Sequence, residues 1–249
     1  MADYWISVSE GVVGNVLTVL VLILAGRIWI GRRYRKLLHF FGLSDGRHLA
    51  VFTSTLRVRP GGSEGSDGIP RSYKGPAVPL NEVALWSNLA ILFEEQVANT
   101  SSLPKPFNSL FVKRASVDHA TSLNANMPSD ASVVTIGSGA YNDISKVIET
   151  RRERLAWFDA DGTAMKFADG SSDSTASRGF IQRLELGGGQ VVFYVAGLST
   201  LGTTAACYHL IRNWAALSRQ ARGKKSFCWF VETDGLSVER TSVIKTITA

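Results

Sequence analysis

The stretch QVVFYVAGLSTLGTTAACYHLIRNWAALSRQ, from Gln190 to Gln220, decides the fold class. It begins with an unbroken apolar run, a pattern typical of a strand that is covered on both faces. A glycine turn follows at Gly197, and the residues after it place apolar side chains at helical spacing. A buried strand, a glycine turn and a helix, in that order, form the repeating unit of a parallel α/β sheet.

The same arrangement occurs earlier, where SVVTI (Ser132–Ile136) leads into a glycine turn and a helical pattern. The segments 179–186 and 190–197 are predicted to pair as a hairpin across Gly187–Gly189. The alternation predicts a Rossmann-like three-layer α/β domain over residues 48–249, with antiparallel strands at one edge. Further strands are predicted at 48–55, 109–116, 155–161, 226–233 and 241–248, and a further helix at 81–98 with Asn81 as its N-cap.

The N-terminal region contains GVVGNVLTVLVLILAG, from Gly11 to Gly26, sixteen residues without a charge. About twenty mainly apolar residues are enough to span a bilayer, so residues 1–30 are predicted to be a single transmembrane helix. The alternatives are a cleaved signal peptide and a buried helix of a soluble domain. A signal peptide carries positive charge before its apolar region, whereas this chain carries it afterwards.

A basic juxtamembrane segment, predicted as a linker or helix over 31–47, follows the apolar stretch. The positive-inside rule predicts that the N-terminus lies outside and the α/β domain in the cytoplasm, at the cell inner (plasma) membrane. Five of the 27 basic residues lie between Arg27 and Lys36, and two of the 21 acidic residues precede them. The remaining chain carries 22 basic and 19 acidic residues. The charge therefore indicates anionic lipid headgroups, not nucleic acid, as partners of Arg32, Arg33, Arg35 and Lys36.

Two cysteines, Cys207 and Cys228, lie in apolar surroundings far apart in the sequence. This pattern is typical of buried free thiols and agrees with a reducing compartment. The four histidines lack the spacing of metal ligands, and no phosphate-binding P-loop motif occurs. We therefore expect neither a metal nor a cofactor.

The two strand–glycine–helix turns are the candidate ligand site. The first free N–H groups of a helix favour an anion, and glycine lets a ligand approach the backbone. Turns at the carboxyl ends of neighbouring parallel strands share one crevice, so a nucleotide-type ligand is predicted there. The alternative is that both turns are purely architectural. The predicted ligand-binding residues are Gly137, Ser138, Gly139, Asn142, Gly197, Ser199, Thr200, Gly202, Thr203 and Thr204, with Thr53, Ser54 and Arg57 as a third wall.

These turns resemble those of the SLOG superfamily, the Rossmann-like domains of LOG phosphoribohydrolases and Smf/DprA proteins. The turn Gly137–Gly139 is similar to that family's first glycine-rich turn, and Gly202-Thr203 to the glycine–threonine step of its second motif. The position of the family's catalytic glutamate falls on Ala206. The resemblance thus implies a binding or sensing member, similar to bacterial defence sensors that are fused to membrane helices.

Enzyme motifs are incomplete. The run Gly197–Gly202 departs from the G-x-S-x-G hydrolase elbow at Leu201, and His209 lies on the helix that the elbow would open. Asp143 and Asp159 are the remaining candidates for acid–base chemistry, while Asp161-Gly162 reads as a turn.

These patterns lead us to expect a membrane-anchored sensor or effector that forms homo-oligomers. A nucleotide-derived signal would change the assembly of its membrane helices. The alternatives are a membrane-tethered nucleotide or nucleoside hydrolase or transferase, and a membrane scaffold that binds protein partners.

Overall fold

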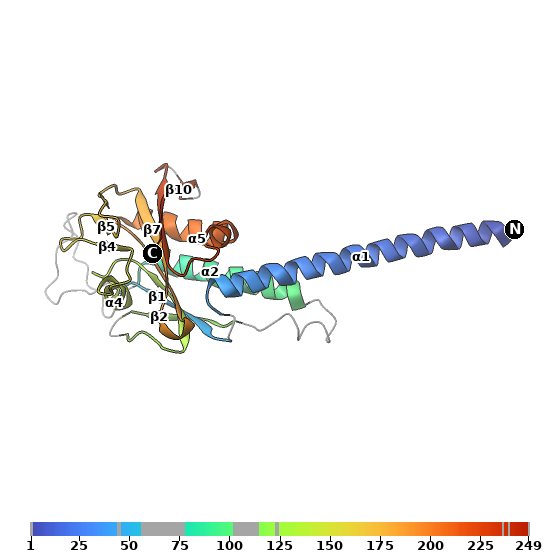
Figure 1. The fold of residues 1–249 in the computed structure, drawn as a ribbon, viewed down its shortest axis with the longest axis horizontal. Coiled ribbons are helices and arrows are strands. Elements are labelled where there is room, and N and C mark those ends of the chain that lie inside the picture. The colour runs from blue at the N-terminus through green and yellow to red at the C-terminus, as the bar shows by residue number, and fades with distance from the viewer. Residues whose placement is uncertain are drawn as a thin grey trace.

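The computed structural model describes residues 2–43, 46–55, 78–101, 115–122, 125–235, 237–238 and 240–248. Within the first two helices it describes the side chains of residues 16–19, 21–40 and 80–95. The chain forms a mixed α/β body from which one long helix projects (Figure 1).

A seven-stranded sheet with the order β10-β9-β7-β8-β3-β1-β2 forms the centre of the body. Strands β2, β1, β3 and β8 pair in parallel, and β7, β9 and β10 add to β8 by successive antiparallel pairings. Antiparallel strands at one edge were predicted, and the sheet confirms them. The strands are β1 (His48–Thr53), β2 (Val117–Thr121), β3 (Ala131–Ile136), β7 (Arg178–Glu185), β8 (Val191–Gly197), β9 (Phe227–Thr233) and β10 (Thr241–Thr248).

The predicted hairpin is present, because β7 and β8 pair from Gly179↔Gly197 to Glu185↔Val191 across a short 3-10 turn at Gly187–Gly189. A second sheet of three short strands was not predicted. It has the order β4-β5-β6 and comprises β4 (Ala156–Phe158), β5 (Met165–Phe167) and β6 (Ser172–Asp173). Only three residues of the strand predicted over 155–161 are therefore in a strand.

Each face of the central sheet buries its own set of side chains. Along β8, Val191, Phe193 and Val195 face a core shared with the helices α2 (Leu80–Ser101) and α5 (Thr200–Gln220). The alternate residues Val192 and Tyr194 face the other core, which α4 (Asp143–Glu149) and the small sheet complete. The period of two along the strand thus produces three layers.

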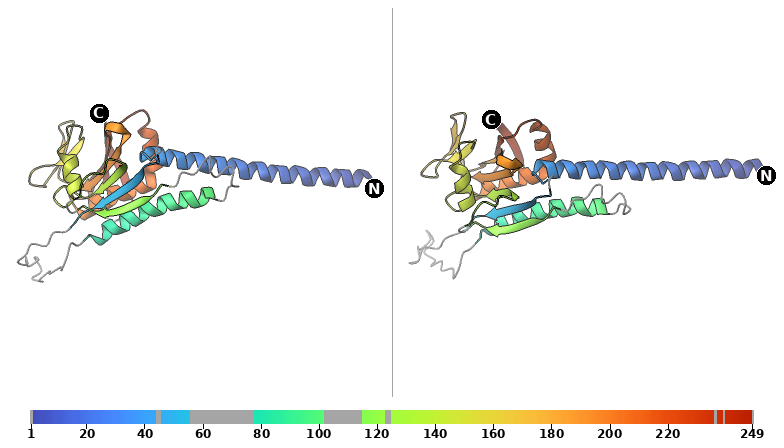
Figure 2. Two further views of the ribbon diagram at one scale, coloured as in Figure 1. Left: turned by 90° about the horizontal axis from the view of Figure 1, so that it is seen from below. Right: turned by 60° about the horizontal axis from the view of Figure 1, so that its bottom comes forward.

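The helix α1 (Ala2–Phe40) has two different halves. Its first part projects from the body, and its last turns pack beside α2 and α5 (Figure 2). Tyr34, Leu37 and Phe41 are fully buried in the core, whereas Val16 and Leu22 are 55% and 66% exposed. The α/β core therefore contains side chains from the segment predicted as a linker over 31–47.

Within the part of the chain that the structure describes, no helix is long and apolar enough to cross a membrane. In the transmembrane helix predicted over residues 1–30, the side chains of residues 1–15 and 20 lie outside that part. Anchoring in a bilayer therefore stays a prediction.

Three local predictions need correction or lie outside the described residues. The strand predicted at 109–116 falls mainly on residues 102–114, which are not described, and the observed strand β2 begins at Val117. Asn81 is not an N-cap, because α2 begins at Leu80 and the Asn81 side chain donates to Thr204 instead. Arg57 and most of the long loop at 59–79 also lie outside the described residues.

Candidate functional site

The two glycine turns lie at one edge of the sheet. Strands β3 and β8 are parallel neighbours, with Ile136 paired to Val195. Gly137 directly follows β3 and Gly197 ends β8, so the two glycines lie at the same end of neighbouring strands. Strand β1 pairs with β3 on the other side and brings Thr53 and Ser54 to the same edge. The topology thus brings the predicted site residues together, apart from Arg57, which is not described.

The Gly137 turn is closely packed against β1. Gly137 has a φ of +91° and donates its N–H to the Val195 carbonyl at 2.9 Å. A Cβ at this position would lie 2.2 Å from Ser54 Oγ. Glycine is therefore required here by the backbone conformation and by a neighbouring side chain, without any ligand.

Asn142 is buried and all of its side-chain hydrogen-bonding capacity is used inside the protein. Its Oδ1 accepts from the N–H groups of Ile144 and Ser145, each at 3.1 Å, as the N-cap of α4. Its Nδ2 donates to the carbonyls of Phe52 and Ile136 at 3.2 and 2.9 Å. With both donors and both acceptor positions occupied, Asn142 joins β1, β3 and α4 and has nothing left for a ligand.

The second turn is likewise held by internal contacts. Ser199 is the N-cap of α5: its Oγ accepts from the Gly202 N–H at 3.1 Å and donates to the Ala176 carbonyl at 2.6 Å. Thr203 Oγ1 accepts from the Gly197 N–H at 3.0 Å. A Cβ at Gly202 would lie 2.2 Å from the Arg178 carbonyl oxygen. These residues therefore close the first turn of α5 against β7.

Polar groups remain for a ligand at only a few predicted positions. Among the described residues, no partner is found for the hydroxyls of Ser138 and Thr200. The Thr204 hydroxyl accepts from Asn81 at 3.3 Å, and Thr53 Oγ1 is 3.0 Å from His119 Nε2 on β2. At Gly139, the N–H donates to Glu149 at 3.2 Å. Within the described residues, one hydroxyl without a partner thus lies on each of the two turns.

A buried carboxylate at this edge was not predicted from the sequence. Glu82, in the first turn of α2, is 6% exposed and accepts from the Ser54 N–H at 2.6 Å. Burial raises the pKa of this carboxyl group, and the hydrogen bonds from Ser54 oppose that rise. An acidic residue in the first turn of a helix is common, so the sequence carries no signal that this one is enclosed between β1 and the Gly137 turn.

The acidic candidates for acid–base chemistry lie in a turn and at the start of a helix, where such residues commonly stabilise the backbone. Asp159 accepts from the N–H groups of Thr163 and Ala164 at 2.7 and 3.1 Å and so closes the turn between β4 and β5. The Asp161-Gly162 turn is confirmed by a φ of +69° at Gly162. Asp143 lies in the first turn of α4.

The imidazole of His209, which was considered for the hydrolase motif, also has a hydrogen-bond partner inside the protein. His209 Nδ1, on α5, lies 2.7 Å from Thr241 Oγ1 of β10, and burial lowers the pKa of this histidine. The described residues contain no group of three His, Cys, Asp or Glu side chains suited to a metal ion. Cys207 and Cys228 are buried free thiols, as predicted.

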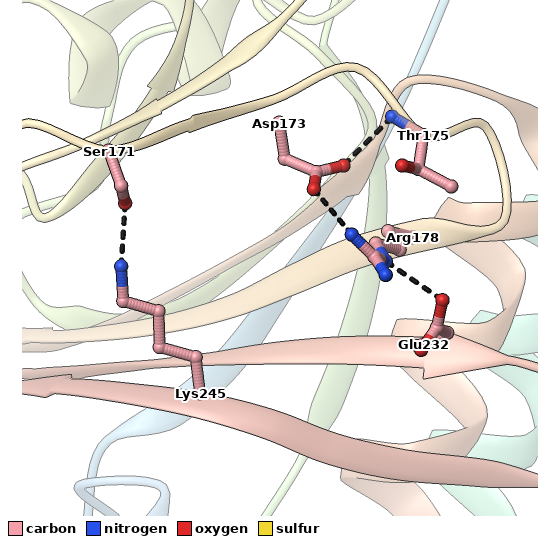
Figure 3. A network of polar contacts seen from close by, with 6 residues as sticks. All are labelled: Ser171, Asp173, Thr175, Arg178, Glu232 and Lys245. Carbon is pink, nitrogen blue, oxygen red and sulfur yellow. Dashed lines mark hydrogen bonds and ion pairs between the residues drawn. The ribbon is translucent and has the colours of Figure 1, made fainter.

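A polar network fixes the segment beside the second turn (Figure 3). Arg178 donates to Asp173 at 2.6 Å and to Glu232 at 2.9 Å, which ties β6, β7 and β9 together. Lys245 of β10 donates to Ser171 at 2.6 Å. The network positions the backbone of residues 176–178, where the Ala176 carbonyl accepts from the Ser199 hydroxyl and the Arg178 carbonyl lies against Gly202.

The described geometry thus consists of two packed glycine turns, two unpaired hydroxyls and one buried carboxylate at the carboxyl edge of a parallel sheet. Comparisons with models of known families, with characterised proteins and with solved structures found no match to this chain.

Proposed function

We propose that this chain is a membrane-anchored sensor or effector. Its Rossmann-like domain binds a nucleotide-type ligand at the carboxyl edge of the sheet. The observation that carries the proposal is the convergence of β1, β3 and β8 at that edge, where ligands of open α/β sheets bind. Two hydroxyls without internal partners in the described part of the chain, on Ser138 and Thr200, supply the donors for phosphate or ribose oxygens.

The anchoring part of the proposal rests on the first half of α1. Its described apolar side chains, from Val16 onward, are exposed on a helix that stands away from the body, an arrangement unfavourable in water. The residues that follow are basic, and Trp29, 62% exposed, lies where interfacial aromatic side chains are found. We place the domain in the cytoplasm on this charge order.

The coupling part rests on the second half of α1. The projecting part and the domain are connected without a linker or hinge, because one continuous helix runs from Ala2 into the core. A ligand that binds one assembly state better than another shifts the population of the two states. We propose that the shift changes the association of α1 helices in a homo-oligomer.

A second candidate is the membrane scaffold, in which the glycine turns have no ligand. The full internal use of the Asn142 amide and the packing of Gly202 against Arg178 favour it. The two candidates differ in whether a small molecule binds.

The decisive experiment measures thermal unfolding of the full chain in detergent against nucleoside phosphates, cyclic dinucleotides and ADP-ribose. The matched variants are S138A/T200V, which removes the unpaired hydroxyls, and S242A/T246V, which removes two exposed hydroxyls on β10. We expect one compound to stabilise the wild-type chain. Its affinity should be at least about tenfold weaker in S138A/T200V and unchanged in S242A/T246V.

Stabilisation by no compound would favour the scaffold over the sensor. Formation of product in the same incubation would favour the hydrolase or transferase, with Glu82 as the carboxyl group to test. Liposome flotation of the full chain tests the anchor separately: release from the vesicles by high salt would contradict a transmembrane helix.

A further inference from the structure

A cavity of about 820 Å³ lies at the opposite edge of the sheet from the glycine turns. Its walls come from the basic end of α1, from the end of β7, and from the last turns of α5 with the turn that leads into β9. Arg183 and Glu185 of β7 line it, and these residues pair with the start of β8. The cavity is therefore distinct from the predicted nucleotide site.

The lining has an unusual charge. Eight arginine and lysine side chains and His39 line the cavity, with one carboxylate, Glu185. The exposed cations come from segments far apart in the sequence, and only those of α1 stood out as a basic cluster in the sequence. They include Arg32, Lys36, Arg219, Arg222, Lys224 and Lys225.

These exposed cations have no counter-charge within the described part of the chain. The single carboxylate of the lining, Glu185, lies 3.8 Å from the buried Arg183, and among the described residues none of these exposed cations forms an ion pair. Like charges gathered in one hollow repel one another, and a bound anion relieves that repulsion.

Contacts of two arginine side chains join the elements that carry the cations. The Arg33 guanidinium lies 5.6 Å from the Trp29 ring centroid and 5.7 Å from that of Trp214, between two aromatic side chains. Arg183 donates to the carbonyls of Phe40 and Lys225 at 3.2 and 2.7 Å. It thereby joins the end of α1 to the turn before β9, so the two basic walls keep a defined separation.

We infer that this cavity binds a ligand that carries two or more phosphate groups. Its volume lies in the range of small-molecule sites, roughly 300–1,000 Å³. Arginine and lysine together make charge-assisted hydrogen bonds to phosphate oxygens. The inference needs the cavity alone and stands whether or not α1 crosses a bilayer. Two sources supply this chemistry: a phosphorylated lipid headgroup beside α1, and a soluble polyphosphate.

The test uses the full chain and two probes. Titration calorimetry in detergent measures binding of inorganic tripolyphosphate. Thermal unfolding in phosphatidylcholine nanodiscs, with and without phosphatidylinositol bisphosphate, measures the lipid source. The variant R222A/K224A removes two cations of the cavity, and K146A/R152A removes two exposed cations on and just after α4.

We expect at least one probe to bind. In R222A/K224A we expect its affinity to fall by roughly ten- to a hundredfold, with unfolding unchanged in the absence of probe, because the two side chains are exposed. In K146A/R152A the affinity should be unchanged. Binding of tripolyphosphate alone assigns a soluble ligand, and stabilisation by the doped nanodiscs alone assigns a headgroup.

Two results would overturn the inference. One is the absence of binding by either probe. The other is an equal loss of affinity in both double variants, which would show attraction to net charge without a site.

Discussion

At the scale of single residues, Glu82 is the most informative side chain. It is a carboxyl group enclosed between β1 and the Gly137 turn, and its hydrogen bond to the Ser54 N–H fixes the end of β1. From the sequence it could be placed only in the first turn of a helix, because burial of one helical residue depends on what packs against it. The burial of Glu82 results from tertiary packing and therefore cannot be predicted from the sequence pattern.

Glu82 predicts a particular dependence of stability on pH. Burial raises its pKa, so the folded chain binds this proton more tightly than the unfolded chain. Its contribution to stability is then largest below the ordinary carboxyl pKa and declines as pH rises through the raised value. We expect E82Q, which still accepts from Ser54, to unfold at a higher temperature than wild type at neutral pH. The difference should vanish at acidic pH.

The control for this prediction is E82L, which leaves the buried Ser54 N–H without an acceptor. We expect it to lose about 1–3 kcal/mol of unfolding free energy at every pH. A wild-type stability that rises with pH relative to E82Q would contradict the assignment.

Asp169 predicts the opposite pH dependence on the surface. The hydrogen bond from Lys245, with further bonds from Ser171, lowers the pKa of Asp169 to about 2. The stabilisation from this pair is present above the ordinary carboxyl pKa and is lost as pH falls toward 2. In K245M, we expect carboxyl NMR titration to show the Asp169 pKa moved up toward its usual range. An unchanged value would mean that Ser171 alone accounts for it.

At the scale of elements, the two strand–turn–helix units were predictable and their contacts were not. Apolar runs, glycine turns and helical spacing correctly identified β3, β8, α5 and the β7–β8 hairpin. Of the sheet β4-β5-β6, only β4 lies within a predicted strand, at 155–161. Strands β5 and β6, of three and two residues, are too short to show any periodicity. The role of Gly202 was not predictable either, because glycine is needed there to leave room for the Arg178 backbone of β7.

Gly202 gives a prediction at this scale. In G202A, the new Cβ would meet the Arg178 carbonyl, so β7 and α5 must separate. We expect a loss of about 3 kcal/mol in unfolding free energy, measured by chemical denaturation. Gly187 is the matched control, because a Cβ added there would have no neighbouring atom within 4 Å, and G187A should change stability by less than about 0.5 kcal/mol. A loss of ligand binding in G202A would therefore not by itself identify a binding residue.

At the scale of the whole molecule, α1 belongs to both the projecting part and the α/β core. Six apolar side chains between residues 34 and 43 are buried: Tyr34, Leu37, Leu38, Phe40, Phe41 and Leu43. The domain boundary was predicted at residue 48, where the first strand was expected, and residues 31–47 before it were predicted as a basic linker or helix. A helix that is basic on one side and buried on the other satisfies both patterns.

This arrangement predicts where the chain can be shortened. Removal of residues 2–29 leaves all six of these buried side chains in place, and we expect the product to fold cooperatively. Removal of residues 2–45 deletes all six side chains and with them on the order of 10 kcal/mol of hydrophobic stabilisation. This loss is comparable to the whole stability of a typical domain. We expect the second product to show no cooperative thermal transition. A cooperative transition would mean that the sheet folds without α1.

The same helix has a consequence for the order in which the protein is made. Residues at the end of α1 are synthesised well before the aromatic side chains that they contact in the fold. The ring centroid of Phe41, just after α1, lies 4.9 Å from that of Phe193, and the ring centroid of Phe40 lies 6.3 Å from that of Trp229. These partners lie on β8 and β9, so the aromatic end of α1 stays uncovered until both strands have been synthesised. Chaperones have that interval in which to hold the nascent chain, because the sheet can cover the end of α1 only after β9 has emerged.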